Sequence, residues 1–240
     1  MRILIVNDDG IHASGLRPLA RWARKLGEVT VVAPDREKSG ASQSIQLHQP
    51  FLVEQQQWEE GITAYAIGSS PADCVRFALF GMQQRYDLVI SGINRGFNMG
   101  TDIMYSGTAG AAFEAALQKI PAVAISTSPE YYEQALEQLD RVFAFFEKHR
   151  LWQQHLAYNV NIPPEGKSIC ITRQGGKYYS DNFVPVENGC YKASGYCVYQ
   201  QGSDLSIDTD AVMSGHISVM PLTIDRTDRE AYGRLAGLRE

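Results

Sequence analysis

Residues 1–10 read MRILIVNDDG, an apolar run that ends on two adjacent carboxylates. Residues 3–6 are all aliphatic and do not alternate with polar residues, a pattern typical of a central parallel strand that is covered on both faces. Gly10 permits the sharp turn that must follow such a strand. Ligands of open α/β sheets bind beyond the carboxyl ends of the strands, so we expect Asp8 and Asp9 to lie where a ligand would bind.

The acidic pair has two interpretations. Adjacent carboxylates repel each other unless a cation or a shared proton lies between them, which makes a divalent metal a natural partner. Alternatively, Asp9 caps the following helix and Asp8 faces the solvent. The ten residues alone do not distinguish the two.

Composition limits the class of protein. The chain has 240 residues, 44% of them hydrophobic and 20% charged, which suits one main domain with an appendage. We expect a Rossmann-like core over residues 1–165 and a C-terminal hairpin and oligomerisation region over residues 166–240, together forming one continuous unit. The net charge of -5 argues against a nucleic-acid polymer as the main partner. With no membrane-spanning run, no signal-peptide pattern and no C-x-x-C pair, we expect a cytoplasmic protein without a membrane partner.

Strand and helix patterns alternate along the first part of the chain. Short aliphatic runs predict strands, and apolar residues at helical spacing predict helices. The predicted strands cover residues 29–33, 45–47, 51–53, 62–67, 87–91 and 121–126, and the predicted helices cover 16–26, 72–82, 109–117 and 131–149. This alternation indicates an α/β fold, a Rossmann-like three-layer αβα arrangement with a mostly parallel sheet.

The pattern changes after residue 149. Strand-like segments follow one another without helices between them, which indicates antiparallel hairpins, and pairs such as Asn188-Gly189 mark turns. These segments cover residues 157–162, 168–173, 196–200, 205–207 and 216–220. A final helix is predicted over residues 225–238.

Two polar loops should share the edge of the sheet with the acidic pair. Residues 34–44 follow the second strand and include Ser39, although serine and glycine are also common in ordinary loops. Residues 92–110 contain five glycines and end at a predicted helix. The Ser106-Gly107-Thr108 segment begins that helix, where free amides and the helix dipole favour a phosphate. Ser106 is equally well explained as a simple helix cap.

Five blocks of sequence, taken in chain order, resemble the SurE family of stationary-phase survival proteins, which are metal-dependent nucleotidases. The blocks are ILIVNDDGIHASGL at 3–16, VAPDREKSGAS at 32–42, PADCV at 71–75, SGINRGFNMG at 91–100 and YSGT at 105–108. The chain departs from the family pattern at Ser69 and Ser70, where glycine and threonine are expected, and at Gln46, where threonine is frequent. None of these departures falls on a metal ligand of the family, so they bear on the preference for base or sugar and not on hydrolysis.

The resemblance implies one Mg²⁺ or Mn²⁺ ion per subunit, held by Asp8, Asp9, Ser39 and Asn94. Oxygen-only ligands suit such a hard cation. It also implies hydrolysis of nucleoside 5'-monophosphates, and of 3'-monophosphates, with Asp8 and Asp9 as catalytic residues. Asp8 is expected to activate the attacking water. In an alternative mechanism, the Asp8 carboxylate attacks phosphorus directly.

For the substrate, the resemblance implies phosphate contacts from Ser106, Gly107, Thr108, Asn98 and Arg95. Asn7 is expected to steady the metal ligands from behind. The family also implies a homodimer or homotetramer built through the C-terminal region. One alternative from another class stays open, a non-catalytic sensor or assembly protein that binds metal and nucleotide without turnover.

Overall fold

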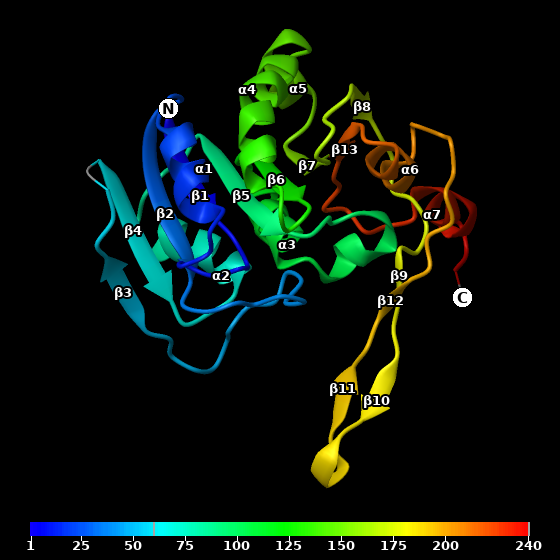
Figure 1. Ribbon diagram of the computed structural model, residues 1–240, viewed down its shortest axis with the longest axis horizontal. Helices are drawn as coiled ribbons and strands as arrows, with labels where there is room; N and C mark the ends of the chain where they lie inside the picture. Colours follow the sequence, from blue (N-terminus) through cyan, green and yellow to red (C-terminus); the bar gives the residue numbers. More distant parts are fainter. Residues whose placement is uncertain (60, 240) are drawn as a thin grey trace.

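The computed structural model describes residues 1–59 and 61–239, which form a nine-stranded sheet with helices on both faces (Figure 1). The sheet order is β3-β4-β2-β1-β5-β6-β7-β13-β8. These strands are β1 (Arg2–Val6), β2 (Glu28–Pro34), β3 (Val53–Gln56), β4 (Ile62–Ile67), β5 (Leu88–Arg95), β6 (Ala122–Thr127), β7 (Ala157–Ile162), β8 (Ile169–Ile171) and β13 (Ile217–Pro221).

Six neighbouring strands, from β4 to β7 in the sheet order, run parallel to one another. β3 runs antiparallel to β4 at one edge, and β13 runs antiparallel to β7 near the other. The chain winds from β1 towards β2 and β4, and then from β5 in the opposite direction towards β6 and β7. The winding direction therefore reverses between β1 and β5, the place where open α/β sheets bind ligands.

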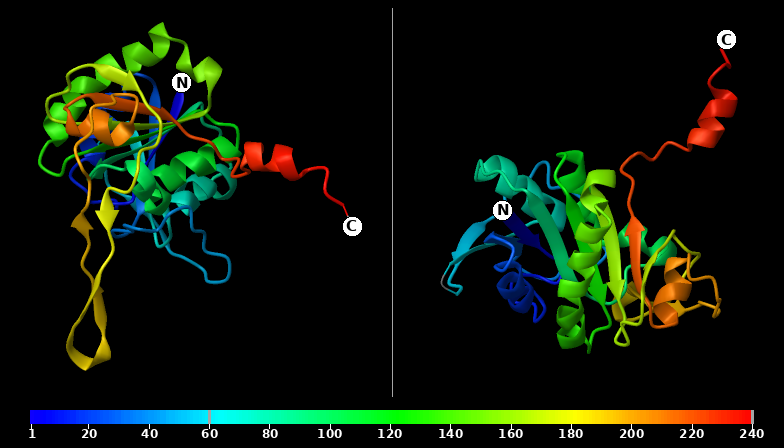
Figure 2. Two further views of the ribbon diagram at one scale, coloured as in Figure 1. Left: turned by 90° about the vertical axis from the view of Figure 1, so that its right-hand side faces the viewer. Right: turned by 90° about the horizontal axis from the view of Figure 1, so that it is seen from above.

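Helices cover β1 from both sides, as the unbroken aliphatic run predicts. Ile3 and Ile5 pack in one apolar cluster with α1 (Leu16–Ala23), α4 (Tyr132–Lys148) and α5 (Leu151–Gln154). Leu4 and Val6 pack in a second cluster with α2 (Pro71–Arg76) and α3 (Gly107–Leu117). All four side chains are fully buried, each stabilising the fold by about 1.5–3 kcal/mol. Figure 2 shows the three layers, which confirm the predicted fold class.

Three predictions in the first part of the chain are wrong in detail. Residues 45–47 form no strand, and their exposed side chains leave nothing to pair with a sheet. The helix predicted over 72–82 begins as α2 but continues as the π-helical segment η1 (Phe77–Gly81). The strand predicted over 51–53 begins only at Val53.

The C-terminal part contains a projecting arm of antiparallel strands (Figures 1 and 2). β9 (Tyr179–Ser180) pairs with β12 (Tyr196–Cys197), and β10 (Phe183–Pro185) pairs with β11 (Tyr191–Ala193). The short helix η3 (Glu187–Gly189) forms the tip of the arm. The predicted antiparallel hairpin is thus confirmed, and it extends away from the main sheet.

Other C-terminal predictions need correction. The strand predicted at 205–207 is a single bridge from Ile207 to Arg173, and an unpredicted helix, α6 (Asp208–Met213), follows. Asp208 is the first residue of this helix, and its buried carboxylate accepts hydrogen bonds from three backbone amides, including that of Thr209. β8 runs parallel to β13, because α6 supplies the crossover that parallel neighbours need.

The last helix, α7 (Arg229–Leu235), begins later than residue 225. Asp228 sets this start, because its carboxylate accepts a hydrogen bond from the amide of Ala231. Figure 2 shows α7 projecting from the body of the protein. None of the described helices has both the length and the apolar character needed to cross a membrane.

Candidate active site at the carboxyl ends of β1 and β5

The turn after β1 is closed by Asn7. Its side-chain amide donates to the carbonyl of Gly10 at 2.9 Å, and its side-chain oxygen accepts from the Gly10 amide at 3.2 Å. Gly10 has a φ of +95°, and an added Cβ would lie 3.0 Å from the carbonyl carbon of Arg36. Asn7 and Gly10 therefore make a tight turn that holds Asp8 and Asp9 just beyond the strand.

Asp8 is 4% exposed and is bonded to the start of α3. Its Oδ1 accepts from the Thr108 hydroxyl at 2.5 Å, and its Oδ2 accepts from the Thr108 amide at 3.2 Å. Burial raises the pKa of Asp8, while the bonds from Thr108 oppose that rise. The Asp8 carbonyl accepts from the amide of Lys38 at 2.7 Å, so this residue also anchors the loop that follows β2.

Asp9 connects the acidic pair to β5. Its Oδ2 accepts from the backbone amide of Arg95 at 3.0 Å. Burial, and then the neighbouring charge of Asp8, raise the pKa of Asp9 to about 6. Two carboxylates therefore share a partly buried edge that lacks enough positive charge, which is the electrostatic situation that a bound cation relieves.

The other two predicted metal ligands lie in adjacent loops. Asn94, at the end of β5, donates from its side chain to the Gly96 carbonyl at 2.8 Å. Ser39 is exposed, and its hydroxyl donates to Glu37 at 2.7 Å. Among the described residues, no hydrogen bond joins Ser39 or the Asn94 side chain to Asp8 or Asp9. The acidic turn thus contacts the end of β5, the loop after β2 and the start of α3, but through groups other than the side chains of Ser39 and Asn94.

The available donor atoms fit a hard cation. Within residues 1–59 and 61–239, no group of three or more His, Cys, Asp or Glu side chains could hold a metal. A metal at the acidic pair would therefore have Asp8 and Asp9 as its charged ligands and neutral oxygens, such as those of Ser39 and Asn94, as the others. Few carboxylates and several neutral oxygens suit Mg²⁺ or Mn²⁺ and do not suit zinc.

The start of α3 lies against the acidic pair. Ser106 caps the helix, because its hydroxyl accepts from the Ala109 amide at 3.1 Å. An added Cβ on Gly107 would lie 2.9 Å from the Asp8 Cβ and 3.1 Å from Pro71. Glycine therefore lets the positive end of α3 approach the carboxylate closely. The capping role of Ser106 is observed, and phosphate binding by Ser106, Gly107 and Thr108 stays a prediction.

Asn98 is held by two asparagines that the sequence analysis did not identify. Its amide donates to Asn161 Oδ1 at 2.9 Å, and its carbonyl accepts from Asn159 and Asn161 at 2.7 and 2.9 Å. Its side chain donates to the Ser126 hydroxyl at 2.9 Å. The signal was present in β7, whose sequence AYNVNI places two polar amides in a fully buried strand. Arg95 is exposed and forms no ion pair with the described residues.

Several proteins are similar to this chain over almost its whole length. A family model described as survival protein SurE matches residues 3–181. A protein named 5'-nucleotidase SurE from Legionella pneumophila strain Philadelphia 1 is 36% identical over 252 residues, covering 99% of this chain and 97% of that protein. A protein of the same name from Desulforudis audaxviator strain MP104C is 38% identical over 248 residues, covering 98% of this chain and 96% of that protein.

A solved structure has the same fold. The crystal structure of SurE protein from Aquifex aeolicus superposes with a TM-score of 0.79 at 31% sequence identity, and the match covers 98% of each chain. A family model over residues 3–181 and relatives at 36% and 38% identity over almost the whole chain establish the family. The chain belongs to the SurE family.

Proposed function

We propose that this chain is a metal-dependent 5'-nucleotidase, which hydrolyses nucleoside 5'-monophosphates, and also 3'-monophosphates, to nucleoside and phosphate. One observation carries the proposal. Two adjacent carboxylates, the buried Asp8 and the half-buried Asp9, lie at the point where the sheet reverses its winding, and Asp8 is bonded to the start of α3. Such an arrangement offers a cation site directly beside an anion site. The names of the relatives support the same activity.

Asp8, Asp9, Ser39 and Asn94 would hold one Mg²⁺ or Mn²⁺ ion per subunit. When bound, the ion supplies charge neutralisation for the phosphate and a lowered pKa for a bound water. Asp8 accepts the proton of the attacking water, and the two bonds from Thr108 fix the orientation of its carboxylate. In the variant mechanism the Asp8 carboxylate attacks phosphorus itself.

The phosphate oxygens would be bound by the helix start and by the loop after β5. We assign the phosphate contacts to Ser106, Gly107 and Thr108, although the amide and hydroxyl of Thr108 donate to Asp8 in this structure, and to Asn98 and Arg95 in the loop after β5. Donors that are fixed before the substrate arrives stabilise charge without reorganisation. Asn98 meets this condition, because its main chain is bonded to two buried asparagines of β7.

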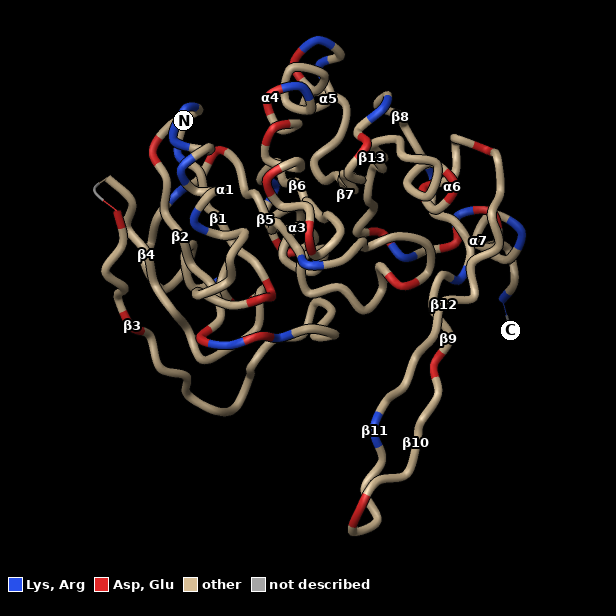
Figure 3. Tube along the Cα trace, viewed as in Figure 1, with Lys and Arg blue, Asp and Glu red and all other residues tan. Residues whose placement is uncertain are grey.

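We further propose a cytoplasmic homodimer or homotetramer that assembles through residues 166–240. The arm supports this, because Phe183 and Tyr191 are 64% and 68% exposed although both are large apolar residues. No nucleic-acid polymer or membrane is proposed as a partner. Figure 3 argues against a nucleic-acid partner, because Lys and Arg residues are scattered among acidic ones along the chain.

The test is phosphate release from a panel of nucleoside 5'- and 3'-monophosphates, with and without Mn²⁺ or Mg²⁺. Native protein is compared with Asp8→Asn and with the control Asp87→Asn, whose side chain lies at the opposite edge of the sheet and bonds to the amide of Arg2. We expect metal-dependent release that collapses in Asp8→Asn and persists in Asp87→Asn. If the protein binds metal and nucleotide but releases phosphate from none of the esters, the proposal of an enzyme is overturned and the non-catalytic sensor is favoured.

A further inference from the structure

The loop that carries Ser39 is fixed on both sides of that residue. On one side the Lys38 amide donates to the Asp8 carbonyl at 2.7 Å. On the other side Ser42 donates from its amide and its hydroxyl to two carbonyls of the short helix η2 (Gly100–Tyr105), at 3.0 and 2.8 Å. The position of Ser39 therefore depends on contacts made by its neighbours.

Two buried carboxylates hold the far side of this loop. Asp73 in α2 is 4% exposed, and its Oδ2 accepts from the backbone amide of Gln46 at 2.7 Å and from the Ser69 hydroxyl at 2.6 Å. Glu114 in α3 is 3% exposed, and its Oε2 accepts from the side chain of Gln43 at 3.2 Å. Acidic residues are seldom buried to this extent unless they are paired.

Arg76 compensates the charge of both carboxylates. Its Nε lies 3.4 Å from Asp73 Oδ1, and its Nη1 lies 3.8 Å from Glu114 Oε1. Gln118 adds a hydrogen bond to Glu114 at 3.2 Å. Removing one partner from such a group leaves a buried charge without compensation, so the arrangement is rigid. Among the residues that the structure describes, its hydrogen bonds to the Ser39 loop are those to Gln43 and Gln46.

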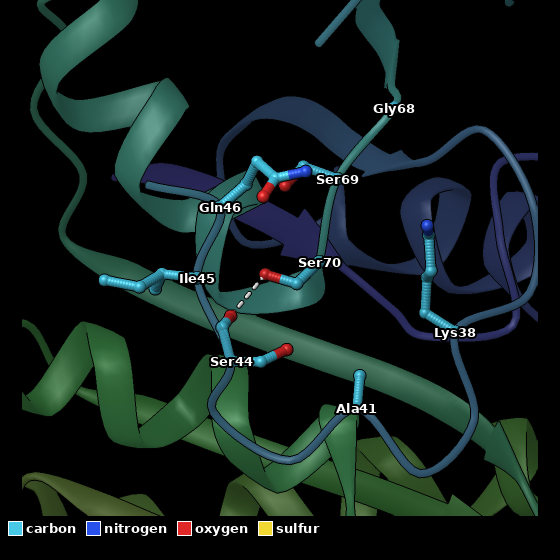
Figure 4. Close-up of a pocket in the computed structure, with 8 residues that line it drawn as sticks. All are labelled: Lys38, Ala41, Ser44, Ile45, Gln46, Gly68, Ser69 and Ser70. Carbon is cyan, nitrogen blue, oxygen red and sulfur yellow. Dashed lines mark hydrogen bonds between the residues drawn. The ribbon is translucent and has the colours of Figure 1, made fainter. Parts of the chain in front are cut away.

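Apolar packing does little to hold the same segment. Ile45 and Leu47 are 39% and 69% exposed. A hollow of about 190 Å³ lies between the loop and the residues before α2. Figure 4 shows the residues that line it and the hydrogen bond that the Ser70 hydroxyl donates to the Ser44 carbonyl. Because the loop spans a hollow instead of packing on a core, its polar contacts determine where it lies.

We propose that Asp73 and Glu114 are positioning residues for the metal site. By accepting hydrogen bonds from Gln43 and Gln46 they restrict the loop that carries Ser39, the proposed neutral ligand of the metal. Without them, metal binding would have to order the loop, and ordering backbone is unfavourable. The inference rests on the proposed function, because it concerns a ligand of the proposed metal.

The test changes the loop and leaves the buried carboxylates in place. The double variant Gln43→Ala, Gln46→Pro removes both loop donors, whereas the control Leu47→Pro introduces proline at an amide without a hydrogen bond to the described residues. Mn²⁺ affinity of the metal-free protein is measured by electron paramagnetic resonance of the free ion. We expect Kd to rise about 10- to 100-fold in the double variant and to stay unchanged in the control. Amide exchange of residues 39–46 should also accelerate in the metal-free double variant.

The same double variant is then made in a Ser39→Ala background, because a residue that acts through Ser39 has no further effect once the hydroxyl is gone. We expect a further rise in Kd of less than about threefold. If the double variant raises the Kd for Mn²⁺ equally in both backgrounds, or raises it in neither, the inference is overturned. If Ser39→Ala leaves Kd unchanged while Asp8→Asn raises it, the inference is also overturned but the metal site stands. If the native protein neither binds Mn²⁺ nor releases phosphate, the proposed function itself fails.

Discussion

The bond between Thr108 and Asp8 can be tested by Thr108→Val. The two side chains have nearly the same shape, and Thr108 is fully buried, so the change removes a hydroxyl without opening a cavity. The lost bond is the one that the hydroxyl donates to Asp8 Oδ1 at 2.5 Å. The backbone amide of residue 108 still donates to Asp8 Oδ2 at 3.2 Å, so the position of the helix is kept.

The expected loss follows from the charge and burial of Asp8. A separation of 2.5 Å is typical of a charge-assisted bond between a hydroxyl and a carboxylate. A bond to a charged group contributes about 1.5–3 kcal/mol, and water cannot replace it because Asp8 is only 4% exposed. Thr108→Val should therefore lower the free energy of unfolding of the metal-free protein by about 1.5–3 kcal/mol. For a chain of this size the corresponding fall in Tm is about 3–12 °C.

The assay is urea unfolding of the metal-free protein in EDTA at pH 8. The control is Thr101→Val, because the Thr101 side chain is exposed and makes no hydrogen bond with the described residues. The control should lie within about 0.5 kcal/mol of the native protein. If Thr108→Val also lies within that range and has the same dependence on urea concentration, the hydroxyl does not hold Asp8 and the reasoning is refuted.

Three further changes test neighbouring parts of the site. Since burial and the charge of Asp8 raise the pKa of Asp9 from 3.8 to about 6, the folded protein loses stability as pH rises through that range. Asp9→Asn should therefore stabilise the metal-free protein at pH 8 but not at pH 4, and equal unfolding midpoints at pH 8 would contradict this. Asn161→Ala removes two bonds to the main chain of Asn98, so urea unfolding should show a loss of about 1–3 kcal/mol, with a lower kcat/KM for AMP. Gly107→Ala should displace Asp8, because the new methyl would lie 2.9 Å from the Asp8 Cβ. We expect kcat/KM to fall up to about 100-fold. An unchanged kcat/KM would show that the start of α3 can move without affecting catalysis.

The location of the site could be predicted from sequence because it follows from two short-range patterns. The unbroken aliphatic run of β1 indicates burial on both faces, and burial on both faces requires helices on each side. Once the strands are parallel, their carboxyl ends must meet at one edge. The meeting of Asp9 with the Arg95 amide confirms that β1 and β5 bring their ends together.

Other features could not be predicted because they depend on contacts between distant segments. The apolar residues at 45–47 have the composition of a strand, yet the loop there bonds to α2 instead of to a sheet. Asp73 looks like an ordinary residue of a helix start, and nothing in its local sequence indicates that it is bonded to Gln46. Asp208, the first residue of the unpredicted α6, bonds to the amides of Gly100 and Gly175, which lie far from it in the chain.

Each loop of the candidate site is fixed by a polar group that lies behind it. Asn7 closes the turn of the acidic pair, Asn161 holds the main chain of Asn98, and Asp73 and Glu114 hold the loop of Ser39. There is a physical reason why the groups that fix the loops differ from the groups proposed to bind the metal. Like charges at the acidic pair reduce the stability of the metal-free fold, as the raised pKa of Asp9 indicates. Bonds remote from the ligand can offset that loss while they fix the geometry of the site.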